Sequence, residues 1–451
     1  MEEERLLRER LKLNTVNKAS NNIESVHGIT QKIQAGELSV EEIIQETQTL
    51  ISRYDGAIKA WKTLNWDAVA GQVKSLVARP NWRSLPLAAV PLAVKDVYDT
   101  ADFLTTYGSS IYQNHRPSTD AKLVSMMRSL GAIVVGKTVT TEFAYWQPGP
   151  TTNPYNPKHT PGGSSSGSAA AVSSGMVPLA LGSQTAASII RPASYCGVYG
   201  FKPSFGILPL DGVKPLAPSL DHAGFLARSV EDIKLCFTAV LGHEHFSQSS
   251  TTNSEKPSSN LTVTTLTGGW KVILQKECQQ AVDDCFASAI SQGSKFSEKV
   301  IFTDFERLTN DQTTLMAAEA VQSFQYEKEF KFHKLSDHVR KLLKEGSEVT
   351  TAQLKQARIP LENPKEFENR LFRDADILMC PSTLDTAPLL GPATGNPMMS
   401  RAFNILGLPS LSVPYRIADS GLPVGVQVVA RRGADLSLLS FAEKYLAKAF
   451  R

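Results

Sequence analysis

The chain has 451 residues, of which 42% are hydrophobic, enough to form one large domain or about two to three ordinary ones around a sizeable core. Its 47 lysines and arginines nearly balance its 44 aspartates and glutamates, and no basic block occurs along it. Because a surface that follows a phosphate backbone needs clustered positive charge, we expect no nucleic acid partner.

A membrane span, a secretion signal and a disulfide framework are not predicted either. The least polar stretch, Ala169 to Gly182, is interrupted by serines, a glycine and a proline, and it is shorter than the roughly 20 apolar residues that a spanning helix needs. The opening residues carry mixed charge without an apolar core. The five cysteines are an odd number without Cys-x-x-Cys spacing, which favours reduced thiols, so we expect a cytoplasmic protein.

Residues 1–60 are predicted to form a helical region that packs on the core. Apolar residues recur there at spacings of three and four, at Leu6, Leu7, Leu11, Ile29, Ile33, Val40, Ile43 and Ile44. Ser39 followed by Glu42 has the pattern of a capping box, which indicates where the last of these helices begins.

The next segment, residues 85–206, indicates alternating strands and helices. The nearly continuous apolar run from Leu85 to Val97 predicts a strand buried on both faces, with Lys95 at its end. A helical pattern at Ala121 to Leu130 leads into the β-branched run AIVVGKT, which is typical of an α/β unit. From Pro161 to Gly206 the chain combines a Gly/Ser-rich stretch, an Ala-rich helix candidate and a second run of small residues.

The remaining chain continues this alternation after a polar surface loop, which is predicted at residues 245–260. WKVILQ, from Trp270, is predicted to be a strand and Glu277 to Ser291 a helix, followed by a charged helical stretch from Thr313 to Glu345. Two more strands, ADILMCPST and GVQVVA, precede a final amphipathic helix, LSLLSFAEKYLAKAF. We find no internal repeat.

Serine chemistry is the most specific function that the motifs indicate. A serine nucleophile needs a base within hydrogen-bond reach and backbone donors for the oxyanion, and no histidine stands out as that base. The pattern Gly-x-Ser-x-Gly occurs once, from Gly163 to Gly167 with Ser165 at its centre, but no β-branched strand leads into it. A lysine at the end of a buried strand is the better base candidate.

A metal site is not expected. The motifs His-Glu-x-x-His and His-x-x-Glu-His are absent, and His243 and His245 form a His-x-His pair without a third ligand nearby. We interpret this pair as solvated.

Three motifs resemble those of the amidase signature family: VKD at Val94–Asp96, TPGGSSSGSAAAV at Thr160–Val172 and GSQTAASIIRPAS at Gly182–Ser194. The likeness continues in the family's order at Leu220–Asp232 and Asn404–Val429, so it covers most of the chain.

The fold that this resemblance implies is a single α/β/α domain with a large central mixed sheet flanked by helices. We place the domain at residues 61–451, with its catalytic core at residues 85–240 and a C-terminal portion of sheet and helices at residues 262–451. The alternation of strands and helices is compatible with this architecture but does not specify it.

The resemblance also implies a triad of a lysine, a serine preceded by a cis peptide and a nucleophilic serine. The lysine of VKD is Lys95, and the small residue before the Ile-Ile-Arg-Pro run is Ser188. The bridging serine of the family lies 24 positions before the nucleophile, which makes it Ser164 rather than its neighbours Ser165 and Ser166. A desolvated, neutral Lys95 would then accept the Ser164 proton while Ser164 accepts that of Ser188.

An oxyanion hole is implied in the turn that ends on the nucleophile. Its donors would be the backbone N–H groups of Thr185, Ala186, Ala187 and Ser188. The chain departs from the commonest family pattern here, because Gln184 replaces an acidic residue and two alanines replace a pair of glycines. Two methyl groups in such a turn predict either altered donor geometry or less room for a bulky acyl group.

Three residues are predicted to bind substrate. Tyr145 and Trp146 lie in a segment that runs towards the acyl pocket in the family, and Gln184 lies beside the oxyanion turn. Nearby residues that we interpret as structural or packing residues are Asn153, Arg191, Asp221 and Cys196.

The resemblance predicts a stand-alone amidase that hydrolyses a small or medium carboxamide through an acyl-enzyme, releases ammonia or an amine and needs no cofactor. Gln184 and Arg191, which follows the nucleophile by three residues, favour this branch of the family. One alternative is the glutaminase subunit of a transfer-RNA-dependent amidotransferase, which would work only with partner subunits. Another is a non-catalytic binding protein that retains the fold. The oligomeric state stays open, and a homodimer is compatible with the sequence.

Overall fold

The strands of the chain form one mixed sheet. The computed structural model describes residues 24–243, 261–268, 272–297 and 299–447. The strands are β1 (Trp61–Leu64), β2 (Pro91–Lys95), β3 (Ile133–Thr138), β4 (Leu179–Gln184), β5 (Tyr199–Lys202), β6 (His222–Ala227), β7 (Thr262–Thr265), β8 (Lys295–Phe296), β9 (Ile377–Pro381), β10 (Ser410–Ile417) and β11 (Pro423–Ala430). Within the described residues they make an 11-stranded sheet in the order β1-β3-β2-β4-β6-β5-β10-β11-β9-β7-β8.

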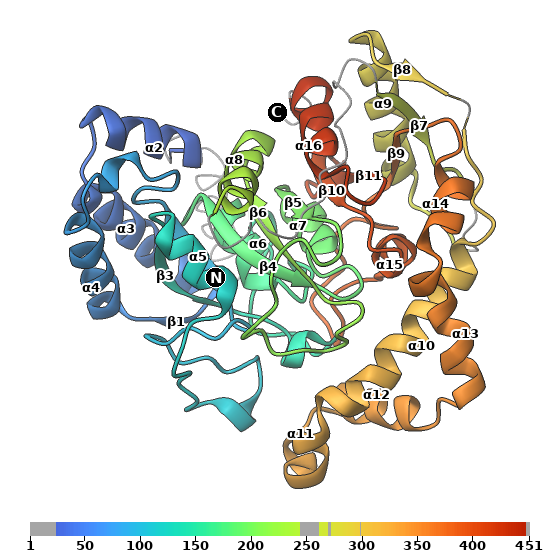
Figure 1. Cartoon of the computed structure of the whole chain (residues 1–451), viewed down its shortest axis with the longest axis horizontal. Helices are drawn as coiled ribbons and strands as arrows, with labels where there is room; N and C mark the ends of the chain where they lie inside the picture. The colour runs from blue at the N-terminus through green and yellow to red at the C-terminus, as the bar shows by residue number, and fades with distance from the viewer. Residues whose placement is uncertain (1–23, 244–260, 269–271, 298, 448–451) are drawn as a thin grey trace, which may run out of the picture.

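Helices cover the sheet and extend beyond it (Figure 1). The α-helices are α2 (Val26–Ala35), α3 (Val40–Ile58), α4 (Trp66–Val77), α5 (Lys122–Ser129), α6 (Ser166–Ser173), α7 (Ile190–Cys196), α8 (Val230–Leu241), α9 (Lys276–Ser291), α10 (Phe305–Ser323), α11 (Gln325–Phe330), α12 (Asp337–Ser347), α13 (Thr351–Glu362), α14 (Pro364–Phe372), α15 (Met398–Ile405) and α16 (Asp435–Tyr445). Short 3-10 helices are η1 (Trp82–Ser84), η2 (Ser110–Tyr112), η3 (Glu142–Ala144) and η5 (Phe332–Lys334).

The central strands are buried on both faces, because successive residues of a strand point to opposite sides of the sheet. In β2, Leu92 and Val94 join a core cluster that includes residues of α5, α8 and α16, whereas Ala93 joins a second cluster with residues of α6 and α7. This two-sided burial explains the apolar residues of β2, although the strand is shorter than the predicted run from Leu85 to Val97, whose first residues form turns. The burial on both faces agrees with the predicted α/β fold, in which a large mixed sheet lies between helices.

The N-terminal helices α2 and α3 pack on the edge of the molecule that carries β1 and β3 (Figure 1). The predicted capping box of α3 is present. The Glu42 N–H donates to Ser39 Oγ at 3.2 Å, and the Ser39 N–H donates to Glu42 Oε2 at 2.9 Å. This capping box begins α3. The predicted apolar positions Leu6, Leu7 and Leu11 lie outside the described residues.

The strand predicted from Trp270 to Gln275 is wrong. Trp270 lies outside the described residues together with its neighbour, and residues 272–275 adopt no strand. The strand of this region is β7, which pairs in parallel with β9 and buries Val263, whereas the side chain of Ile273 is 95% exposed. An apolar run becomes a strand only where a neighbouring strand can pair with it. The predicted loop at residues 245–260 falls outside the described residues.

The charged helical stretch predicted from Thr313 to Glu345 consists of three α-helices, α10, α11 and α12, rather than one. α10 begins earlier, at Phe305, and packs against α12, α13 and α15 at the lower right of Figure 1. It ends at Ser323, because the backbone of the next residue, Phe324, is no longer helical. The ring of Phe324 is buried, and its centroid lies 4.9 Å from that of Phe143. Helix α10 therefore belongs to a group of packed helices together with α12, α13 and α15.

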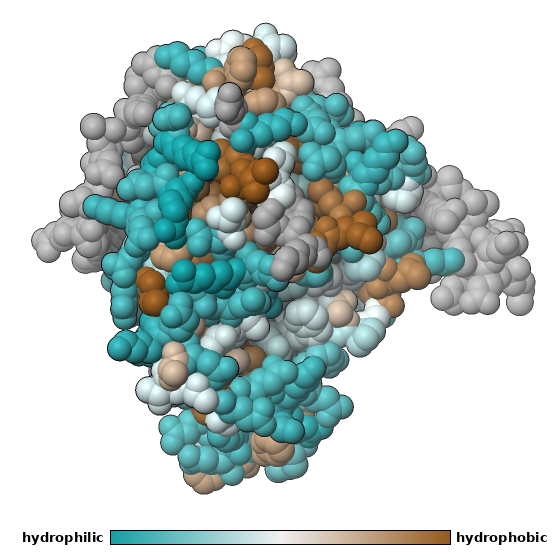
Figure 2. All heavy atoms as spheres, turned by 90° about the vertical axis from the view of Figure 1, so that its right-hand side faces the viewer, coloured by the Kyte–Doolittle hydropathy of each residue, from teal (hydrophilic) through white to brown (hydrophobic). Residues whose placement is uncertain are grey.

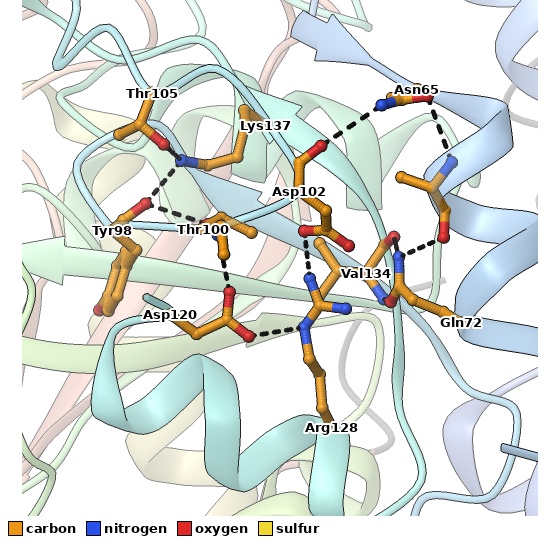
Figure 3. A network of polar contacts seen from close by, with 12 residues as sticks. Asn65, Gln72, Tyr98, Thr100, Asp102, Thr105, Asp120, Arg128, Val134 and Lys137 are labelled. Atoms are coloured by element: carbon orange, nitrogen blue, oxygen red, sulfur yellow. Dashed lines mark hydrogen bonds and ion pairs between the residues drawn. The ribbon is translucent and has the colours of Figure 1, made fainter. Parts of the chain in front are cut away.

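A polar network fixes the ends of β2 and β3 (Figure 3). Lys137 Nζ donates to the Tyr98 carbonyl oxygen at 2.6 Å and to Thr105 Oγ1 at 2.7 Å, and it lies 3.3 Å from Asp96 Oδ1. Arg128, in the same region, pairs with two further aspartates. Because Asp96 follows Lys95 directly, this network holds the backbone on which Lys95 stands.

The surface is mostly polar on the face that Figure 2 shows, with separate apolar patches between the polar side chains. Exposed apolar side chains of this kind, such as Phe296 on β8, are normal on soluble domains. The five cysteines are free and buried. Among the described residues, no helix combines the length and the apolar composition that crossing a membrane requires.

Gly167 tests whether the Gly/Ser-rich segment is a packed element rather than a flexible linker. A Cβ at this position would lie 2.2 Å from the Ala60 carbonyl oxygen and 2.5 Å from the Val139 nitrogen. Gly167→Ala should therefore lower the free energy of unfolding by about 1–3 kcal/mol, measured by denaturant titration. The control Gly71→Ala, on an open position of α4, should be neutral or stabilise by up to about 1 kcal/mol. Equal stability of Gly167→Ala and the wild type would contradict tight packing here.

Candidate active site

Two neighbouring parallel strands bring Lys95 and Ser188 to the same edge of the sheet. Lys95 is the last residue of β2, and β4 runs parallel beside it. After β4 the chain makes a short turn, which contains Ser188, and enters α7. The carboxyl ends of adjacent parallel strands form the edge where α/β sheets usually bind ligands. Ser164 reaches this edge from the loop that precedes α6.

Lys95 lies in hydrogen-bond contact with Ser164. Its Nζ is 2.7 Å from Ser164 Oγ, 2.9 Å from Ser183 Oγ and 3.1 Å from the Ser183 carbonyl oxygen. The peptide bond between Gly163 and Ser164 is cis, the feature that the resemblance implies for the bridging serine. Because a carbonyl oxygen can only accept, Lys95 donates to Ser183 O and keeps its remaining capacity for the two hydroxyls.

The neighbouring serines have other partners. Ser165 Oγ donates to the Ser183 carbonyl oxygen at 3.2 Å, and Ser166 Oγ donates to the Val139 carbonyl oxygen at 3.2 Å. Neither of them lines the cavity that contains Ser188. The Gly-x-Ser-x-Gly match centred on Ser165 is thus placed in the packing between α6 and β4.

Burial favours the neutral form of the Lys95 amine over its ammonium form. Its side chain is fully buried, and this burial holds its pKa well below the usual value, with Asp221 opposing the shift and Arg191 adding to it. No carboxylate of the described residues lies within ion-pair distance of Lys95 Nζ. Lys137, on the adjacent strand, is equally buried but pairs with an aspartate. Of these two lysines, Lys95 is the one whose neutral form the surroundings favour more.

Ser188 and Ser164 line one cavity of about 30 Å³. Ser188 is 7% exposed, and in the described part of the chain its hydroxyl makes no hydrogen bond. The side chain can therefore turn towards Ser164, as catalytic hydrogen bonds often shorten only when substrate is bound. The predicted oxyanion donors Thr185, Ala186 and Ala187 line the same cavity.

The turn before Ser188 is held from outside through Thr185. Its carbonyl oxygen accepts from Gln312 Nε2 and from Asn404 Nδ2, each at 2.7 Å. Its hydroxyl donates to Asp221, which also accepts the backbone N–H groups of residues 216 and 217. Burial raises the pKa of Asp221 to about 6, although these hydrogen bonds oppose the shift. With its carbonyl and hydroxyl bound on the outer side, Thr185 keeps the turn in one conformation.

The alanine pair does not require an unusual backbone. Ala186 and Ala187 are not among the described residues with positive φ, so no left-handed conformation opposes their side chains. Both alanines line the cavity, and a methyl group occupies space that a glycine would leave open. The alternative of reduced room, rather than distorted backbone, is the one that the structure supports.

Gln184 does not line the cavity, in contrast to its prediction as a substrate-binding residue. Its Oε1 accepts the N–H groups of Ile189 and Ile190 at 2.9 and 3.1 Å, and its Nε2 donates to Asn404 Oδ1 at 3.3 Å. The side chain is buried and both ends of its amide are bonded within the protein. Gln184 thus caps the start of α7, where backbone N–H groups lack helical partners.

Tyr145 and Trp146 do line the cavity beside Ser188. Their segment has unusual backbone geometry, because Phe143, Ala144 and Trp146 all have positive φ. Non-glycine residues adopt this conformation mainly where surrounding structure holds them, often at binding sites. Phe143, packed against Phe324 of the helical region, provides such an anchor.

The structure adds cavity residues that the motifs did not reveal. Arg401 and Pro397 reach the cavity from α15 and the residue before it, and Met316 reaches it from α10. Met316 and its helix lie in a region predicted only as a charged helical stretch. No local signal distinguishes such residues, because they meet the catalytic loops only after the chain has folded.

Arg191 and the other residues interpreted as structural make mainly backbone contacts. Arg191 donates to the carbonyl oxygens of Gly163 and Gly395 at 2.6 and 2.7 Å, so it holds the loop that carries Ser164. Asn153 donates to two backbone carbonyls, and the buried Cys196 contacts another. These contacts agree with a structural role.

No group of three potential metal ligands occurs in the described chain. His243 is half-buried, with Nε2 2.6 Å from Ser129 Oγ, so it is not simply solvated, and His245 lies outside the described residues.

Comparison with known proteins places these features in a family. The family profile named Amidase matches residues 42–439. Curated relatives include two glutamyl-tRNA(Gln) amidotransferase subunits. The one from Exiguobacterium sibiricum is 31% identical across 92% of this chain and 95% of the relative, and the one from Halothermothrix orenii is 30% identical across 93% and 95%.

Solved structures agree with this placement. One describes a vestigial protein complex that reveals the evolutionary origins of an s-triazine catabolic enzyme; it is 28% identical, with a TM-score of 0.83 over 94% of this chain and 98% of that one. Another, an amidase, is 25% identical with a TM-score of 0.83 over 94% and 100%. A bacterial aryl acylamidase, at 21% identity, shares the fold with a TM-score of 0.82 over 94% and 96%. The chain belongs to the amidase signature family and is a hydrolase that acts on carbon–nitrogen bonds.

Proposed function

We propose that the protein is a stand-alone amidase that hydrolyses a carboxamide through an acyl-enzyme on Ser188, with Ser164 and Lys95 as the proton relay. The observation that carries this proposal is the 2.7 Å contact between Lys95 Nζ and Ser164 Oγ beside the cavity that also contains Ser188. A buried, unpaired lysine is the kind of base that can be neutral near physiological pH.

In the first half of the reaction, Ser188 Oγ attacks the carbonyl carbon while its proton passes to Ser164 and the Ser164 proton passes to Lys95 Nζ. The carbonyl oxygen becomes an oxyanion, for which we propose the backbone N–H groups of residues 185–188 as donors, because these residues line the cavity. When the C–N bond breaks, the relay runs backwards and protonates the leaving nitrogen, which departs as ammonia or an amine.

In the second half, a water molecule attacks the acyl carbon and loses its proton through the same relay. The Ser188 oxygen then leaves the acyl carbon and regains a proton, so the free acid is released and the enzyme returns to its starting state. No redox step is involved, and the residues at the cavity can carry every proton transfer.

Ser188→Ala should abolish amide hydrolysis, because it removes the attacking oxygen; we expect a fall in kcat of at least about 10⁴-fold. A fluorophosphonate probe should form an adduct with the wild type at Ser188, located by peptide mass spectrometry, and none at this position in the variant.

The matched control is Ser165→Ala, which removes the buried serine next to Ser164 but keeps Ser188 and the contact between Ser164 and Lys95. Its labelling at Ser188 should persist. Undiminished hydrolysis by folded Ser188→Ala, or loss of the adduct in Ser165→Ala instead, would refute the assignment of the nucleophile.

The pH profile of kcat/KM should report Lys95. Because burial lowers its pKa, the amine stays neutral further down the pH scale than an exposed lysine would, and activity should be lost as pH falls through that pKa. Lys95→Arg should be inactive throughout, since a guanidinium keeps its proton. A wild-type rate that stays constant down to about pH 5, with the fold intact by circular dichroism, contradicts Lys95 as the base.

A second candidate function is favoured by the curated relatives, which are amidotransferase subunits. In that case the chain would supply ammonia within an assembly, and one structural relative is itself described as part of a protein complex. We expect instead that the isolated chain releases ammonia from small carboxamides, measured in a coupled assay. Turnover that appears only when partner subunits and glutamine are present, and is absent with every small amide alone, would favour the amidotransferase role.

A further inference from the structure

Arg401 stands at the junction of two cavities. It lines the small cavity that contains Ser164 and Ser188, and it also lines an adjoining cavity of about 470 Å³. The two cavities share the side chains of Trp146, Pro397 and Arg401 as a common wall. The inner cavity, at about 30 Å³, is far below the roughly 300 Å³ of a typical ligand pocket, so a substrate must extend past Arg401 into the outer one.

The charge of Arg401 has no counterion in the described chain. Its Nη1 donates to Gln312 Oε1 and, at 2.8 Å, to Thr313 Oγ1, both neutral oxygens. No described carboxylate lies within ion-pair distance of its guanidinium, and the residue is 9% exposed. Burial lowers the pKa of Arg401 to about 10, so the group is still charged at neutral pH. A buried cation without an opposite charge is costly unless a ligand supplies one.

The other guanidinium of the cavity does not remove this imbalance. Arg191 donates through Nη1 and Nη2 to two backbone carbonyls and to Thr394 Oγ1, so its hydrogen bonds serve the loops around Ser164. Burial lowers the pKa of Arg191 to about 10, and electrostatic repulsion from Arg401 adds to this shift, so each cation lies in the field of the other. Asp385 opposes the shift of the Arg191 pKa, but neither arginine forms an ion pair within the described chain, so an anionic group is the complementary ligand of the cavity that they line.

We propose that the substrate of the amidase reaction is an amide that also carries a carboxylate, which Arg401 binds at the junction of the two cavities. This inference rests on the proposed function and names the substrate class of the same site. Nε and Nη2 of Arg401 make no hydrogen bond with any described residue, so two donors of the planar fork remain for a carboxylate.

Gln312 connects this contact to the oxyanion turn. Its Oε1 accepts from Arg401, and its Nε2 donates to the Thr185 carbonyl oxygen at 2.7 Å. A carboxylate bound to Arg401 would fix the guanidinium and, through Gln312, the turn that precedes Ser188. Arg401 is in this view a specificity-determining residue whose occupation affects kcat as well as KM.

The test compares matched substrates. Monoamides of succinic, glutaric and adipic acid are paired with unbranched neutral amides of similar chain length, and kcat/KM is measured by ammonia release. We expect the wild type to prefer the best-fitting anionic amide by about 10- to 100-fold, the range of a charge-assisted hydrogen bond. Arg401→Met should lose this preference, because kcat/KM should fall much further on the anionic amides than on the neutral ones, while fluorophosphonate labelling at Ser188 persists. Arg401→Lys should retain part of the preference.

Arg358→Met is the matched control, because it removes the same charge from an exposed position on α13 and should leave the preference unchanged. Equal kcat/KM for anionic and neutral amides in the wild type, or an equal loss on both in Arg401→Met, would overturn the proposal. The second result would mean that Arg401 is only structural.

A binding measurement separates this inference from the proposed function. Calorimetry on Ser188→Ala needs no turnover, and it should detect binding of the preferred monoamide at least about tenfold tighter than that of its neutral partner, with the difference lost in Ser188→Ala/Arg401→Met. Selective binding without any wild-type hydrolysis or Ser188 labelling would refute the proposed function but uphold the anion site. Hydrolysis and Ser188 labelling without selective binding would uphold the proposed function but refute the anion site.

Discussion

The structure depends on one constraint: a lysine amine buried without a counterion must be held where neutral groups can satisfy it. Lys95 meets this condition at the end of β2, between the Ser164 hydroxyl and the two oxygens of Ser183. The adjacent Asp96, which could have paired with it, is bound by Lys137 instead. The ion pair between Lys137 and Asp96 therefore engages the nearest carboxylate in sequence and favours the neutral form of the Lys95 amine.

The turn before Ser188 depends on parts of the chain far from it in sequence. Thr185 is held by Asp221, directly before β6, by Gln312 on α10 and by Asn404 on α15. Two helices from the C-terminal half of the chain, α10 and α15, thus hold the turn next to Ser188. This arrangement would also join the proposed catalysis to the proposed recognition, because Gln312 contacts Arg401 through the other end of its amide. The same two helices therefore position a cavity-lining cation that has no counterion in the described chain.

Much of the fold could be predicted where local patterns agree with tertiary packing. The capping box at Ser39 and the apolar residues of β2 are such cases, because each local pattern favours the same structure that the tertiary packing favours. The strand predicted at Trp270 failed because an apolar run does not reveal whether a neighbouring strand will pair with it. Gln184 was misplaced for a similar reason: proximity to the nucleophile in sequence does not tell which side of the turn a side chain faces.

The sequence by itself determined the order, spacing and chemical type of the residues that we propose for the reaction, because Lys95, Ser164 and Ser188 lie in motifs that can be recognised along the chain. Only the tertiary structure decided that Ser183 also contacts the lysine, how the alanine pair is accommodated and that Arg401 lines both cavities. These properties depend on burial and on contacts between residues far apart in the chain, such as that between Thr185 and Asn404. Desolvation and cavity shape arise from such contacts, and no local pattern encodes them.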